Sequence, residues 1–425
     1  MAAILPDVSM LLMEYCSPSK IPSLSSRHAA APIYHYRYDH RGRDPTCPLP
    51  YRLLASTHRT QSRGALIMAA TQRFAFLDAA RGIAVLWMIQ VHVTNVILDP
   101  QLRQSMFFNI LNLSNGYVAP TFIFCAGAGL WIALSRRGTK YLEFGPELMT
   151  YLRRLSFVLF CAYLLHAPIY SLGQMLHAPA STWMKWAQLD VLHVIVYASL
   201  AALGVFLVLR DLSRATIAYG VIAAIIFSIS WMVPKSELSQ FPLLPWSGYL
   251  FTGAAVTGWF MQTSDRDRLA RLFIVMGLVG PVVLFLNLLY GPSMPWDGFW
   301  WRSPEGLLFR VFATLLLLGI LYRWESSIPT TRVGRFLVTL GNESLFMYVG
   351  HLLIVYGSLA PWMDNVLGTH EVGYGLTFLI WVLVSAVFSA LMLAWHGLKR
   401  DKPDVAAKII RLTVIAIVIY FIHKR

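Results

Sequence analysis

Residues 79–98 read AARGIAVLWMIQVHVTNVIL, an almost unbroken apolar run. The length of this run matches the roughly 20 residues that a helix needs to cross the hydrocarbon core of a membrane. Two of its polar side chains stand out, Arg81 near its start and His92 toward its end. Ten further apolar segments follow at short intervals, so the character of this stretch is repeated along most of the chain.

These segments predict an all-α fold, a polytopic transmembrane helix bundle of about eleven spans. The predicted spans cover 79–98, 116–134, 151–172, 188–209, 214–233, 244–262, 270–290, 306–323, 336–358, 373–396 and 405–422. No internal repeat is apparent, so the pattern does not favour an inverted-repeat transporter.

The composition agrees with this fold class. Of 425 residues, 57% are hydrophobic and only 13% are charged, whereas soluble domains carry roughly 25% charged residues. Disordered, collagen-like and disulfide-framework classes are therefore excluded. The four cysteines have no metal-binding or redox spacing. They are Cys16, Cys47, Cys125 and Cys161.

The formal net charge is +14, and its distribution predicts an orientation in the membrane. Loops that follow odd-numbered predicted spans carry four Lys or Arg residues, and the other loops carry sixteen. The four are Arg103, Lys185, Lys235 and Arg302. Because cytoplasmic loops hold the excess of basic residues, we expect the amino end inside and the carboxyl end outside. This distribution explains the basic charge, so no nucleic-acid partner is expected.

Residues 1–67 are rich in Pro, Ser, Arg and His and show no sustained helical pattern. Three explanations remain open for this segment: a targeting segment, a disordered tail, or a translation start at Met68. We favour a start at Met68. The expected division is therefore 1–67, disordered or not translated, and 68–425, the membrane domain.

Polar groups inside a span are costly and usually face the bundle interior. Arg81 and His92 are eleven residues apart, close to three turns, so they share a helix face about 16 Å apart in height. Asn95 lies on that face, and Asp78 is placed to cap the helix and to pair with Arg81. Arg81 as a headgroup anchor and His92 as a structural histidine are the alternatives.

Two later segments supply supporting candidates. Asp190 and His193 are three residues apart on one helix face, where a carboxylate can orient an imidazole; Asp190 as a simple helix-start residue is the alternative. Ser344 and His351 are seven residues apart and share a face of the ninth predicted span. For Glu343, near the cytoplasmic end of that span, the role of a solvated cap is open.

The sequence predicts no metal site. It contains neither HExxH nor CxxC, and His92, His193 and His351 fall on different predicted helices. Phosphate-binding and dinucleotide-binding glycine motifs are also missing.

Several blocks, in order along the chain, resemble the catalytic domain of the heparan-alpha-glucosaminide N-acetyltransferase family. They are RFAFLDAARGIAVLWM at 73–88, APTFIFCAG at 119–127, DVLHVI at 190–195, FPLLPW at 241–246 and GNESLFMYVGH at 341–351. The spacing of Arg81 and His92 also resembles the arginine–histidine signature of bacterial integral-membrane acyltransferases that modify envelope sugars.

This resemblance implies transfer of an acyl group, expected to be acetyl from cytoplasmic acetyl-CoA, to a sugar hydroxyl or amine. The bacterial signature implies that Arg81 and His92 are an essential pair; the lysosomal branch of the family does not clearly place a histidine at position 92. His92 can act as a base or a nucleophile. Arg81, or the cytoplasmic Arg153 and Arg154, are candidates to hold the phosphates of CoA.

The candidate catalytic residues are therefore His92, Arg81, Asp78 and Asn95. The expected partners are the lipid bilayer, acyl-CoA and a carbohydrate or lipid-linked sugar, and the expected location is the bacterial inner membrane. The oligomeric state stays open. Two other functions remain: a transporter or flippase for a glycan or lipid intermediate, and a non-catalytic membrane protein in which the histidines only join helices.

Overall fold

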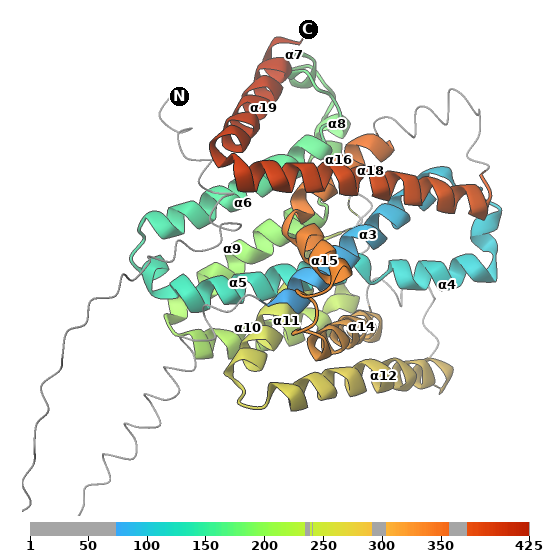
Figure 1. The fold of residues 1–425 in the computed structure, drawn as a ribbon, viewed down its shortest axis with the longest axis vertical. Helices are drawn as coiled ribbons and strands as arrows, with labels where there is room; N and C mark the ends of the chain where they lie inside the picture. Colours follow the sequence, from blue (N-terminus) through green and yellow to red (C-terminus); the bar gives the residue numbers. More distant parts are fainter. Residues whose placement is uncertain (1–73, 234–238, 240, 291–302, 357–371, 425) are drawn as a thin grey trace, which may run out of the picture.

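The computed structural model describes residues 74–233, 239, 241–290, 303–356 and 372–424. These residues form a helical bundle (Figure 1). Among them, the only β-type pairing is a single bridge between Leu98 and Val372. The all-α prediction is confirmed for this part of the chain. The predicted division at residues 67 and 68 lies outside the described residues.

The helices follow one another with short connections. They are α3 (Ala75–Ile97), η1 (Leu102–Gln104), α4 (Met106–Asn115), α5 (Val118–Leu142), α6 (Pro146–Leu165), α7 (Leu172–Leu176), α8 (Ala180–Trp186), α9 (Val191–Leu209), α10 (Leu212–Ser228), η2 (Ser230–Met232), α11 (Leu243–Gln262), α12 (Arg266–Tyr290), α14 (Pro304–Arg323), α15 (Arg332–Asn342), α16 (Ser344–Ile354), α18 (Tyr374–Asp401) and α19 (Pro403–His423).

Each of the eleven predicted spans overlaps a described helix or a pair of described helices. Among the described residues, seven helical stretches are long and apolar enough to cross a membrane, and an eighth is added if the bent pair α15–α16 counts as one span. The shortest of the remaining predicted spans is α10, which has 17 residues. The protein is therefore an integral, polytopic helical membrane protein, while the count of eleven and the orientation stay predictions.

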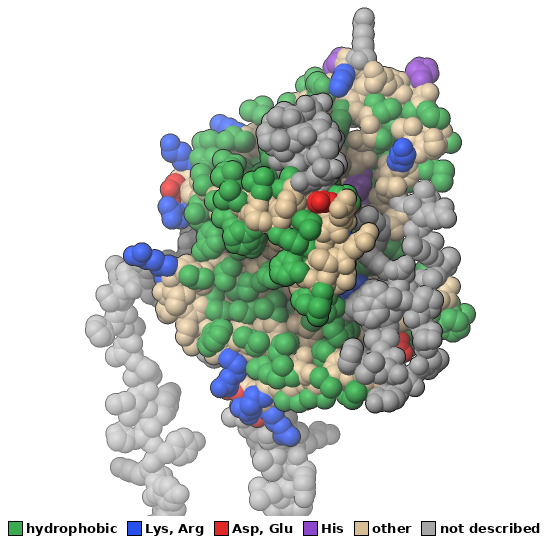
Figure 2. Space-filling model, turned by 90° about the vertical axis from the view of Figure 1, so that its right-hand side faces the viewer, with side chains coloured by type: hydrophobic (Ala, Val, Ile, Leu, Met, Phe, Trp, Pro, Cys, Tyr) green, Lys and Arg blue, Asp and Glu red, His purple; other side chains and the backbone are tan. Residues whose placement is uncertain are grey.

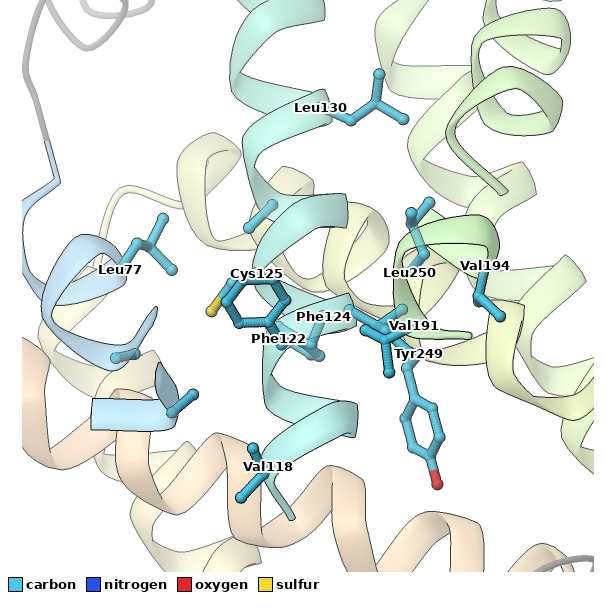
Figure 3. Packing of buried hydrophobic residues seen from close by; sticks show 14 of the residues in the cluster. Leu77, Val118, Phe122, Phe124, Cys125, Leu130, Val191, Val194, Tyr249 and Leu250 are labelled. Carbon is cyan, nitrogen blue, oxygen red and sulfur yellow. The ribbon is translucent and has the colours of Figure 1, made fainter. Parts of the chain in front are cut away.

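The centre of the bundle is built from α3, α5 and α11 (Figure 1). Helices α5 and α11 touch through their backbones, because a side chain at Gly127 would overlap the carbonyl of Leu250 and one at Gly253 would overlap the carbonyl of Phe124. Small residues allow this approach in membrane helix pairs. Around this contact, Phe124, Leu250 and Val191 of α9 pack together (Figure 3).

The ninth predicted span, 336–358, is broken within its described residues, so the prediction of one continuous helix was wrong. Helices α15 and α16 meet at Glu343 with a bend of 76°. Helix α15 is amphipathic, and its carboxyl end packs against α3. The buried carboxylate of Glu343 binds Lys399 of α18 at 2.8 Å and His396 at 2.9 Å. Glu343 is therefore not a solvated cap. An ion cluster with α18 thus lies at the residue where the chain changes direction.

The outer surface suits contact with lipid. Large apolar side chains are exposed along several helices, with examples at Val282 of α12, Leu379 of α18 and Leu412 of α19. Figure 2 shows one face covered largely by hydrophobic side chains, with most of its Lys and Arg toward the lower and left-hand edges. Exposed apolar surface of this extent is expected where lipid tails replace water.

Candidate functional site

Helix α3 holds all four candidate catalytic residues. Asp78 and Arg81 form an ion pair one turn apart, in which 9% of the Asp78 side chain and 20% of the Arg81 side chain are exposed. The predicted pairing of these two residues is therefore confirmed. The predicted cap is not, because α3 begins at Ala75 and Asp78 lies inside its first turn.

Glu325, on the connection between α14 and α15, supplies the cap instead. Its carboxylate accepts hydrogen bonds from the backbone amides of Ala75 at 2.9 Å and Phe76 at 2.6 Å. These amides are among the first N–H groups of the helix, which have no partner within it. Burial raises the pKa of Glu325 above its ordinary value, against the effect of the two amide hydrogen bonds. The sequence alone gave no sign of this contact between residues far apart in the chain.

The amino-terminal half of α3 lies directly against α15. A side chain at Gly82 would overlap the carbonyl of Leu337, and one at Gly341 would overlap the carbonyl of Asp78. The segment that opens the first predicted span and the segment that precedes the bend are thus in backbone contact. The bent pair α15–α16 reaches both the Asp78–Arg81 pair and His92.

At the other end of α3, His92 faces polar rings from α16 and from the residues just after it. The ring centroids of His92 and His351 are 5.2 Å apart in an edge-to-face arrangement. The Nδ1 atom of His92 lies 2.9 Å from the hydroxyl of Tyr356. The structure therefore brings together two of the histidines that the sequence placed on separate helices.

His351 is held in one orientation. Its Nδ1 atom is 2.6 Å from the carbonyl oxygen of Met347. A carbonyl can only accept, so Nδ1 holds the hydrogen and Nε2 keeps a lone pair. The side chain is 0% exposed, and Nε2 has no hydrogen-bond partner within the described residues.

A second polar group surrounds Asp190, the N-cap residue of α9. Its Oδ1 atom accepts the backbone N–H of His193 at 3.0 Å and lies 2.8 Å from His193 Nδ1. Its Oδ2 atom lies 3.2 Å from Nε2 of His166, at the end of α6. The structure confirms both sequence interpretations, because Asp190 begins the helix and also contacts the imidazole of His193.

Tyr348 links the two histidine groups. Its hydroxyl is 3.5 Å from Asp190 Oδ2, and its ring centroid is 6.0 Å from that of His351. His166 and Tyr348 were both missed as site residues. Tyr348 lies three residues before His351 and hence on the same helix face, which was a usable signal. No such signal pointed to His166.

The other candidates differ in how exposed they are. The side chain of Asn95 is exposed, and its backbone carbonyl accepts a hydrogen bond from Arg103 at 2.9 Å. Ser344 is half-buried at the start of α16. Arg153 is exposed and Arg154 half-buried on α6, which packs against α9 and α5. Among the described residues, no group of His, Cys, Asp and Glu side chains is arranged to hold a metal ion.

A buried arginine within a span was also missed. Arg310 of α14 is 3% exposed, and its guanidinium lies 5.6 Å from the ring centroid of Trp246. An intramembrane arginine is unusual enough to have been singled out from the sequence.

A family model matches a large part of the chain. Residues 73–292 match the family model described as heparan-alpha-glucosaminide N-acetyltransferase, catalytic, which covers more than half of the chain. The chain belongs to this family. The comparison with curated proteins found no match. The matched range includes His92, Arg81 and Asp190, whereas His351 lies beyond it.

Membership of the heparan-alpha-glucosaminide N-acetyltransferase catalytic family makes this a membrane protein of an acyltransferase-type family. The family uses acetyl-CoA.

Proposed function

We propose that the protein is an integral-membrane acyltransferase that moves an acetyl group from cytoplasmic acetyl-CoA to a hydroxyl or amine of a sugar or lipid-linked sugar. The observation that supports this most strongly is the contact between His92 and His351, with ring centroids 5.2 Å apart inside a bundle of this family. Acyl transfer needs a group that takes a proton from the acceptor or holds the acyl group, and imidazole can do either.

The acyl donor is proposed to bind from the cytoplasmic side, where the predicted topology places the start of α3. Arg81 lies there and is fixed by Asp78. Arg153 and Arg154 lie on α6, and guanidinium groups match phosphate oxygens in geometry and charge. We propose that these arginines hold the phosphates of CoA while the thioester extends along α3 toward His92. We also propose that the membrane is a bacterial inner membrane.

The acceptor is proposed to meet the acyl group at His92. The nearby groups would orient it, since Asp190, His193 and Tyr348 offer hydrogen-bond acceptors and donors within one connected cluster. The chemistry of the step is simple. The acceptor oxygen or nitrogen forms a bond to the acyl carbon, the carbon–sulfur bond breaks, the acceptor loses a proton, and CoA leaves as a thiol.

The experiment uses the full chain purified in detergent and given acetyl-CoA labelled in the acetyl group, with glucosamine as the sugar probe. The proposal predicts that label appears on glucosamine and that free CoA is released in equal amount. Proteoliposomes with fluorescently labelled lipid-linked sugar test the transporter alternative. Movement of that lipid without consumption of acetyl-CoA would contradict the proposal.

A further inference from the structure

The Nε2 atom of His351 has no role in the function proposed above, and its surroundings require an explanation. It is enclosed in the protein, with the side chain 0% exposed, and it has no hydrogen-bond partner among the described residues. Buried polar atoms are nearly always satisfied, and a buried acceptor without a donor requires an explanation. One explanation is that the donor arrives with a substrate.

The orientation of the ring fixes which atom is free. Nδ1 of His351 donates to the Met347 carbonyl at 2.6 Å, one turn earlier in the same helix. When one ring nitrogen of a histidine donates to a backbone carbonyl, that nitrogen keeps the proton and the other nitrogen is left with a lone pair. Nε2 is therefore held as a proton acceptor before any ligand binds.

His193 is also fully buried, and its Nε2 also has no hydrogen-bond partner among the described residues, but its neighbours are different. Its Nδ1 lies against Asp190 at 2.8 Å, and its ring stands edge-on to Tyr163 with centroids 4.5 Å apart. His351 instead stands beside His92, the residue that the proposed function places at the acyl group. Only His351 combines a free ring nitrogen with direct contact to that residue among the described histidines.

We propose that His351 is a second catalytic residue, whose Nε2 takes the proton from the attacking hydroxyl or amine of the sugar acceptor. This inference rests on the proposed function. In the step, the lone pair of the acceptor oxygen or nitrogen forms the bond to the acyl carbon, and the proton passes to Nε2. The carbon–sulfur electrons leave with the CoA sulfur, which is protonated as a thiol. His92 is then available to contact the acyl group.

Two substitutions separate this role from a structural one. In His351→Asn, the side-chain amide can still donate to the Met347 carbonyl, but the proton acceptor at the Nε2 position is removed. His351→Gln keeps a polar atom near the Nε2 position but removes the N–H group that donates to the Met347 carbonyl. His396→Asn is the matched control, since His396 binds Glu343 at 2.9 Å in a separate ion cluster.

The assay measures CoA release from acetyl-CoA with two acceptors. Glucosamine is largely protonated near neutral pH and needs a base, whereas hydroxylamine is largely unprotonated there and needs none. We expect His351→Asn to slow acetylation of glucosamine by about 10²–10⁴-fold, as for loss of a general base, and to leave the hydroxylamine reaction within about threefold of the wild type. His396→Asn is expected to preserve both rates.

Three results would overturn the inference. The first is an equal loss with both acceptors, the second is no loss with either, and the third is failure of both His351 variants to fold, which would assign the residue to stability. A wild-type protein that releases no CoA with either acceptor would instead overturn the proposed function itself, and the inference with it.

Discussion

The imidazoles of His92 and His351 stand edge-to-face, with their ring centroids 5.2 Å apart. One comes from the first described helix and the other from the helix after the bend at Glu343. Next to them, the hydroxyl of Tyr356 contacts His92, and the hydroxyl of Tyr348 contacts Asp190. A connected set of titratable and hydroxyl side chains inside a membrane bundle is costly to bury, which favours a functional role for it.

The ion pair at the start of α3 should be important for stability. Arg81→Gln removes the guanidinium that pairs with the buried Asp78 carboxylate. We expect the free energy of unfolding to fall by about 3 kcal/mol. This value is at the lower end of the range for breaking a buried ion pair, because part of Arg81 is exposed. The double variant Asp78→Asn/Arg81→Gln should recover much of the loss. Thermal melting in detergent measures both, and additive losses would contradict the pairing.

Backbone contact between α5 and α11 predicts a steric effect at Gly127. Gly127→Ala places a methyl group against the Leu250 carbonyl, and we expect a loss of about 1–3 kcal/mol from overpacking. Gly204→Ala on α9 is the control, since nothing lies within 4 Å of a side chain there. Melting temperatures should fall for the first variant alone. Equal melting temperatures would mean that the two helices are not in contact.

The raised pKa of Glu325 should make the stability of the protein depend on pH. Folding raises the pKa of this carboxyl group through burial, so the folded state keeps the proton at pH values where the unfolded chain has lost it. Its contribution to stability is therefore full below the unfolded pKa of about 4.3 and declines as the pH rises through the folded pKa. Glu325→Gln does not titrate. The melting temperature of the wild type relative to this variant should fall as the pH is raised from 4 to 7, and a rise would contradict the assignment.

Asp190 is expected to stabilise α9 by its side-chain oxygen. Asp190→Ala removes the acceptor of the His193 amide and should cost about 1 kcal/mol, the usual value for a lost N-cap. Asp190→Asn keeps an acceptor oxygen and should cost less. Hydrogen exchange at the His193 amide is the readout, because its protection should fall in the alanine variant and persist in the asparagine variant. Unchanged protection in both would exclude the cap.

The helices were predictable because their lengths and apolar character are local properties of the sequence. The contacts of Asp78 with Arg81 and of Asp190 with His193 were predictable for the same reason, since each pair is separated by one turn of a helix. The bend at Glu343 was not, since Glu343 is paired there with Lys399 and His396, which lie more than fifty residues away in the sequence. The approach of His166 to Asp190 likewise depends on packing between α6 and α9, which no spacing in the sequence records.

The most direct test of the central claim is acetyl-CoA turnover by the purified His92→Ala protein. The variant should insert, remain monodisperse and melt near the wild-type temperature, because His92 is only half-buried. We predict that its release of CoA in the presence of glucosamine falls by about 10²–10⁴-fold. A folded variant that turns over acetyl-CoA at the wild-type rate would contradict the account.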